Sequence, residues 1–123
     1  MSPESVAEIA KAQLPEHIRN NSRNLPNAHF AFCPAPLQAD HLDPEGSFSL
    51  GCAIQGEQRV LKDGRRGRSK GTIYWYGAAN IDYWIDGEKG IIVFVVGNYF
   101  PFAEQSWVDF IAGVEGLIYE GLE

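Results

Sequence analysis

Apolar residues near the start of the chain recur with the spacing of one helix face. In the first 14 residues they are Val6, Ile9, Ala10 and Leu14. Ser2 and Pro3 provide an N-cap and a first helical residue, and Pro15 stops the pattern. The pattern therefore predicts a short amphipathic helix over residues 1–14.

A second helical pattern covers residues 102–119, directly after Pro101. Its apolar stripe contains Trp107, Ile111, Val114 and Ile118, widened by Phe110 and Leu117. Gly113 and Gly116 interrupt this pattern, and each costs about 1 kcal/mol inside a helix. We therefore expect another element to pack closely against them, either the sheet or a second copy of the helix.

Residues 47–97 show the patterns of strands. They predict strands at Ser47–Ile54, Thr72–Tyr76, Asn80–Asp86 and Ile91–Val96. The last strand contains no polar residue, which is typical of a strand covered on both faces. The sequence thus predicts an α+β fold, an antiparallel sheet of about four strands flanked by N- and C-terminal helices.

Residues 15–46 show no sustained period and are rich in proline and asparagine. Structureless connections of this length are uncommon inside a compact domain. The segment also contains apolar Phe30, Phe32 and Leu37, so we expect it to wrap over another part of the protein or over a second subunit. All 123 residues are expected to form a single domain.

Charge and composition exclude several classes of protein. The net charge of −6 argues against a nucleic-acid binder. The longest apolar run, Ile91–Val96, is far shorter than a membrane helix, and the first residues do not resemble a signal peptide. We therefore expect a cytoplasmic protein. Cys33 and Cys52 have no metal-binding spacing, so no metal or other cofactor is expected.

Two stretches carry a more specific signal. They are Gly67–Asn80, which reads GRSKGTIYWYGAAN, and Tyr83–Ile91, which reads YWIDGEKGI and precedes Phe100-Pro101-Phe102. These stretches resemble the C-terminal part of the serine β-lactamase-related esterase and transesterase family. That family includes fungal acyltransferases that decorate statin-type polyketides. The resemblance implies a β-lactamase-like domain and a polyketide-like small-molecule substrate.

The resemblance also implies a chemistry, in which the serine of an S-x-x-K motif attacks an acyl carbonyl. It implies that the strand containing Trp75, Tyr76 and Gly77 lines the acyl group, with the N–H of Ala78 as an oxyanion donor. However, no serine here has a lysine three residues on, and no Tyr-x-Asn occurs. We therefore expect a truncated β-lactamase-like domain that lacks the S-x-x-K half.

Local departures from the family pattern nominate other residues for catalysis. Tyr76 stands where relatives carry a small residue, and Asp82 stands where an aromatic residue is usual. Asp82 shares a strand face with Asn80 and Trp84. It is either an edge-facing or salt-bridged aspartate or an acid–base group with a raised pKa.

Aromatic, histidine and arginine side chains complete the set of candidates. The cluster of Tyr74, Trp75 and Tyr76 is either core or a ligand-binding wall, and strand alternation places Trp75 opposite the two tyrosines. The three histidines lack metal-binding spacing, and His29 and His41 are the candidate general bases if the long loop covers a pocket. Five basic residues between positions 62 and 70 form a basic loop: Lys62, Arg65, Arg66, Arg68 and Lys70. This basic loop is either solvated or binds an anionic substrate group through Arg66 and Arg68.

Three functions follow from these residues. The favoured hypothesis is a repurposed enzyme of polyketide biosynthesis that uses acid–base chemistry as a hydrolase or lactonising cyclase. The alternatives are the C-terminal subunit of a split serine hydrolase or acyltransferase, and a non-catalytic binding protein. We expect either a homodimer or a partner chain, because a monomer would leave one face of Ile91–Val96 in water.

Overall fold

The computed structural model describes residues 1–17 and 45–123. Its elements are α1 (Pro3–Ala10), β1 (Ser47–Phe48), β2 (Ala53–Ile54), β3 (Ile73–Gly77), β4 (Ile81–Asp86), β5 (Ile91–Val96) and α5 (Gln105–Glu120). Most of the predicted wrapping segment, residues 18–44, and with it His29, His41 and Cys33, lies outside the described residues. No helix of the described segments is both long and apolar enough to cross a bilayer.

The five strands form one antiparallel sheet in the order β1-β2-β3-β4-β5. The predicted α+β class is confirmed, but the sheet has five strands rather than four because the predicted strand Ser47–Ile54 is a hairpin. The hydroxyl of Ser49 accepts hydrogen bonds from the N–H groups of Gly51 and Cys52. A serine turn of this kind reverses the chain after only two paired residues on each side.

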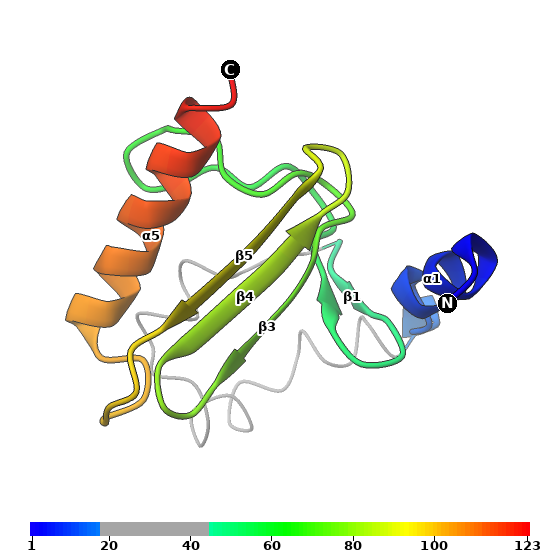
Figure 1. Ribbon diagram of the computed structural model, residues 1–123, viewed down its shortest axis with the longest axis horizontal. Helices are drawn as coiled ribbons and strands as arrows, with labels where there is room; N and C mark the ends of the chain where they lie inside the picture. The colour runs from blue at the N-terminus through cyan, green and yellow to red at the C-terminus, as the bar shows by residue number, and fades with distance from the viewer. Residues whose placement is uncertain (18–44) are drawn as a thin grey trace.

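Helix α1 begins as predicted, with the side chain of Ser2 accepting a hydrogen bond from the N–H of Ser5. The predicted end at residue 14 is wrong, because the helix stops at Ala10. The N–H of Gln13 instead donates to the carbonyl of Phe48 at 2.8 Å, which ties this segment to β1. No residue of α1 is buried, and Figure 1 shows the helix beyond β1, away from α5.

Helix α5 packs on the sheet face formed by Asp82, Trp84 and Asp86 of β4. The indole of Trp107 donates to Asp82, and the hydroxyl of Tyr119 donates to Asp86. The predicted apolar stripe is therefore only partly right. Trp107 and Ile111 are buried as expected, but the buried side also contains Val108, Glu115, Gly116 and Tyr119. Phe110 and Leu117 face solvent, because two polar residues, Glu115 and Tyr119, turn the helix toward their partners.

The described residues cover β5 on one face only, and the expected cover by a second copy or a partner chain remains a prediction. Residues on this strand alternate, and Ile92, Phe94 and Val96 are exposed. In the β4–β5 register they lie beside Ile85, Tyr83 and Ile81, on the sheet face opposite α5. Within the described segments, one face of the sheet is therefore covered by α5, and the other is largely apolar and exposed.

Candidate functional site

The aromatic residues of β3 contact one another and the turn before α5. The rings of Trp75 and Tyr76 stack with centroids 5.1 Å apart, and Tyr76 lies 5.9 Å from the ring of Phe102. Phe48 of β1 meets Trp75 edge-on at 5.4 Å. Strand alternation predicted Trp75 on the face away from Tyr76, yet the two rings stack on each other. The result is a continuous row of four rings.

The turn between β3 and β4 follows directly on this row. Gly77 pairs with Ile81, so the connection consists of Ala78, Ala79 and Asn80. Asn80 adopts a positive φ of 55°, which is the left-handed residue that a three-residue hairpin turn requires. Ala78 is exposed at the tip, and no hydrogen bond of its N–H is found among the described residues.

Asn80 is fully buried and holds the neighbouring loop in place. Its amide donates to the carbonyls of Tyr99 and Pro101, and its carbonyl oxygen accepts from the N–H of Ala103 at 2.8 Å. The side chain of this predicted substrate-binding residue is thus fully used by the protein. Asn80 fixes the loop that places Phe102 beside Tyr76.

Asp82 lies directly across the β3–β4 ladder from Tyr76. Its side chain accepts a hydrogen bond of 2.9 Å from the indole N–H of Trp107, and only 8% of the residue is exposed. Burial raises the pKa of Asp82, while the Trp107 hydrogen bond and the charges of Arg68 and Arg59 oppose this shift. The carboxyl group is therefore a weaker acid than an aspartate in water.

Asp86, at the other end of β4, has a lowered pKa instead. It accepts hydrogen bonds from the Tyr119 hydroxyl at 2.7 Å and from the N–H groups of Ser69 and Lys89, each at 3.0 Å. Burial raises the pKa of Asp86, but these hydrogen bonds outweigh it and lower the pKa to about 2. Burial raises the pKa of Tyr119, and its hydrogen bond to Asp86 raises it further. Asp86 is an ionised structural anchor.

Between these two aspartates lies a buried charged cluster that the sequence did not indicate. Arg68 lies over the rings of Trp84 and Tyr74, 4.5 Å and 5.0 Å from their centroids. Its Nη2 is 3.3 Å from the carboxylate of Glu115, and Arg59 approaches the same carboxylate at 3.6 Å. Arg68 and Glu115 are almost completely buried. The predicted substrate-binding residues Arg68 and Trp84 therefore occupy the core.

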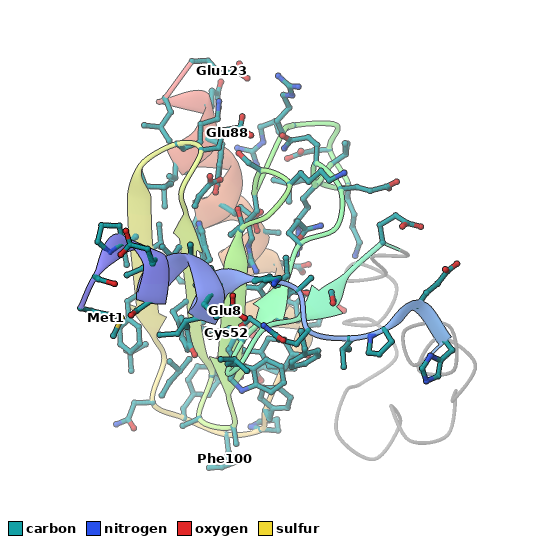
Figure 2. The ribbon with its side chains drawn as sticks, turned by 90° about the vertical axis from the view of Figure 1, so that its right-hand side faces the viewer. Met1, Glu8, Cys52, Glu88, Phe100 and Glu123 are labelled. Atoms are coloured by element: carbon teal, nitrogen blue, oxygen red, sulfur yellow. The ribbon has the colours of Figure 1, made fainter. Side chains whose placement is uncertain are left out.

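Arg66 lies in a different place from Arg68. It lines a hollow of about 250 Å³ together with Gly64, Arg65, Gly116, Glu120 and Glu123. Figure 2 shows Glu123 at the opposite end of the molecule from Phe100. The basic loop therefore divides into an exposed part near the end of α5 and a buried part under the sheet.

The structure thus brings together some of the predicted site residues and separates others. Tyr76, Asp82 and Trp75 lie close to one another, with Gly77 and Ala78 at the end of the same strand. The other candidates lie elsewhere in the fold or outside the described residues. Within residues 1–17 and 45–123, no three His, Cys, Asp or Glu side chains cluster in a way that could hold a metal ion.

Sequence reasoning missed Trp107 as the partner of Asp82 and Glu115 as the partner of Arg68. The helical pattern indicates only the helix face that these two residues share, not their partners on the other elements. Trp107, Ile111, Glu115 and Tyr119 are spaced by four residues, so they share one helix face. An acidic residue on the apolar face of a helix indicates a buried ion pair.

Solved structures share this arrangement of strands and helices. The LovD6 mutant of simvastatin synthase from Aspergillus terreus matches 99% of this chain at 24% identity, with a TM-score of 0.77. The unliganded simvastatin synthase matches 97% of the chain at 22% identity, with a TM-score of 0.78. This chain spans 29% of the length of each of these two structures. Over this length, the chain therefore shares the fold of simvastatin synthase, in agreement with the predicted α+β architecture.

Comparison with sequences gives no further relatives: no protein-family model matches the chain, and no curated protein matches it.

Proposed function

We propose that this chain is a repurposed β-lactamase-like protein of polyketide biosynthesis that binds the acyl part of its substrate along β3. The observation that carries the proposal is the row of rings from Phe48 through Trp75 and Tyr76 to Phe102. This row leads to the exposed Ala78 at the end of the strand. The family resemblance of this strand and the fold shared with simvastatin synthase support an acyl polyketide as the ligand.

The proposed chemistry is acid–base catalysis, as in a hydrolase or a lactonising cyclase. No serine of the chain is followed three residues later by lysine, so the activated nucleophile of an acyl-enzyme mechanism is missing from this sequence. Asp82 is the proposed proton donor, because its raised pKa favours the neutral carboxylic acid. Tyr76, its half-buried cross-strand neighbour, is the group proposed to contact the substrate.

Incubation with an acyl N-acetylcysteamine thioester and with a polyketide ester tests this chemistry. Product is followed by mass spectrometry for the wild-type chain and for Asp82→Asn and Tyr76→Phe. We expect Asp82→Asn to lose at least about a hundredfold in rate, the lower end of the contribution of a general acid–base group, and Tyr76→Phe to be slower than the wild type. Asp109→Asn, an exposed carboxylate on α5, is the matched control and should keep the wild-type rate. Absence of turnover by the wild-type chain on every ester and thioester would refute the acid–base proposal.

A second candidate function is acyl binding without turnover, either alone or with a partner chain that supplies the S-x-x-K serine. The limited exposure of Asp82 and its hydrogen bond to Trp107 favour this alternative. It predicts that the same thioester raises the melting temperature although no product forms. Trp75→Ala should abolish this shift, whereas Phe100→Ala, which removes an exposed ring outside the row, should retain it. A His29 or His41 general base remains a prediction.

A further inference from the structure

We propose that the indole N–H of Trp107 positions Asp82 for proton transfer: it occupies Oδ2, so that Oδ1 is the oxygen that carries and donates the proton. This inference rests on the proposed function, because it takes Asp82 as the acid, and it makes Trp107 a positioning residue. The observations that carry it are the contacts of the indole, the contacts of the carboxyl group and the charges around both.

The indole of Trp107 is held by contacts from α5 and from the loop after β5. Only 7% of Trp107 is exposed. The ring of Tyr99 meets the indole edge-on at 6.1 Å, and the ring of Phe110 lies 5.6 Å from it. Gly97 leaves the space that the indole fills, because a Cβ at this position would lie 2.9 Å from Cζ3 of Trp107. The indole therefore has little freedom to turn, and its N–H keeps a fixed direction toward β4.

The two carboxyl oxygens of Asp82 have different surroundings. Oδ2 accepts the hydrogen bond from Nε1 of Trp107 at 2.9 Å, a typical length for N–H···O, whereas no hydrogen bond to Oδ1 is found among the described residues. The indole N–H can only donate, and a carbonyl oxygen accepts better than a hydroxyl oxygen. Neutral Asp82 therefore carries its proton on Oδ1. Tyr76, the group proposed to contact the substrate, lies directly across the ladder on the same sheet face.

Charges of both signs act on this carboxyl group. Burial raises the pKa of Asp82, and the Trp107 hydrogen bond opposes the rise more strongly than the charges of Arg68 and Arg59 do. The charge of Glu115 raises the pKa further. A hydrogen bond becomes stronger when its acceptor gains a charge. Trp107 therefore also stabilises the carboxylate that proton transfer leaves behind.

The proposed proton transfer uses each oxygen for a separate task. The O–H bond at Oδ1 breaks, and the proton passes to the leaving oxygen or sulfur of the ester or thioester. The water or hydroxyl group that attacks the carbonyl carbon returns a proton to Oδ1 afterwards. Throughout these steps Oδ2 keeps the Trp107 hydrogen bond, so the carboxyl group does not rotate and Oδ1 stays directed at the substrate.

An NMR titration of the full chain tests this assignment without relying on turnover. In ¹⁵N-labelled protein, we expect the indole N–H signal of Trp107 to shift as Asp82 ionises, because its acceptor changes charge. Asp82→Asn should abolish this shift. An indole signal that does not change with pH in the wild type, or that changes equally in Asp82→Asn, would overturn the proposal. This measurement needs no substitution of Trp107 itself.

Trp107→Phe keeps an aromatic ring on α5 and removes the N–H. The ¹³C signal of the Asp82 carboxyl carbon should titrate with a higher pKa in this variant than in the wild type, because a contact that favours the ionised form is lost. Tyr119→Phe is the matched control, since it removes the other hydrogen bond from α5 to an aspartate of β4. It should leave the titration of Asp82 unchanged. An equal change in both variants, or none in Trp107→Phe, would contradict the assignment.

Turnover separates this inference from the proposed function. On the acyl thioester, the kcat of Trp107→Phe should fall by up to about a hundredfold, the cost of displacing a reacting group by about 1 Å. Tyr119→Phe should keep the wild-type kcat. If the wild-type chain turns over no substrate, the proposed function fails, and the NMR titrations still decide whether Trp107 holds Oδ2 of Asp82. Turnover at the wild-type rate by Trp107→Phe would refute its positioning role.

Discussion

Removing the charge of Asp86 should change how the stability of the protein depends on pH. Asp86 accepts three hydrogen bonds in the fold, from a phenol and from two backbone N–H groups. Asparagine has nearly the same shape but carries an NH2 group in place of one carboxylate oxygen. In Asp86→Asn this NH2 must face at least one of the three donors, so at least one hydrogen bond is lost and its donor is left without this acceptor.

The pKa of Asp86 sets the magnitude of the effect. A fall from the ordinary value of 3.8 to about 2 corresponds to about 2.5 kcal/mol of stability for the ionised form. Because the pKa is lower in the folded state, the unfolded state binds the proton more tightly. The contribution is therefore complete above about pH 4 and is lost as the pH falls toward 2. We expect Asp86→Asn to cost about 2–3 kcal/mol at pH 7 and much less at pH 2.

Urea denaturation of both proteins from pH 2 to pH 7 measures this difference directly. The free energy of unfolding of the wild type minus that of Asp86→Asn should rise by about 2 kcal/mol between pH 2 and pH 4 and then stay constant. Contributions of the other acidic groups are common to both proteins and cancel in the difference. Asp109→Asn, on the exposed side of α5, should show no such rise. A difference that does not change between pH 2 and pH 4 would refute the assignment of Asp86 as an ionised anchor.

Three other predictions concern α5 and β4. Gly113→Ala should stabilise the protein by about 0.5–1 kcal/mol in urea denaturation, because nothing lies within 4 Å of the added methyl group. Glu115→Gln should lower the free energy of unfolding, measured by urea denaturation, by about 3–5 kcal/mol, because Arg59 and Arg68 lose their counter-charge. Glu120→Gln, which removes an exposed ion-pair partner, should lower it by less than about 1 kcal/mol. The melting temperature of Asp82→Asn should rise relative to that of the wild type as the pH increases from 4 to 8. A raised pKa means that ionising the buried carboxyl group of the wild type costs stability. The opposite trend would contradict the burial of Asp82.

Local signals in the sequence determined the class and order of the elements. The N-cap at Ser2, the β-branched and aromatic runs of β3 to β5, and the spacing of four in α5 are each set by neighbouring residues. Such signals depend on backbone propensity and on side-chain periodicity, which act within one element. The sequence therefore predicted the α+β class, the hairpin before β5 and the final helix, and it placed Tyr76 and Asp82 on adjacent strands.

Tertiary structure decided which side chains became the core and which faced solvent. The apolar periodicity of α5 allowed several rotations of the helix, and only the partners of Glu115 and Tyr119 on the sheet side selected one of them. In the same way, Arg68 is buried because Glu115 comes from a helix 47 residues later in the chain. Pairings across such distances cannot be read from local patterns, because they depend on how the elements pack.

The two short strands β1 and β2 and the exposed face of β5 show the same division. An apolar run predicts a strand, but the hydroxyl of Ser49 decides where that strand reverses. A strand without polar residues predicts burial, but burial requires a neighbour, and none of the described elements covers Ile92 and Phe94. The sequence by itself thus specified which surfaces are apolar. The packed structure decided which of those surfaces the described elements cover, because burial depends on contacts between distant segments.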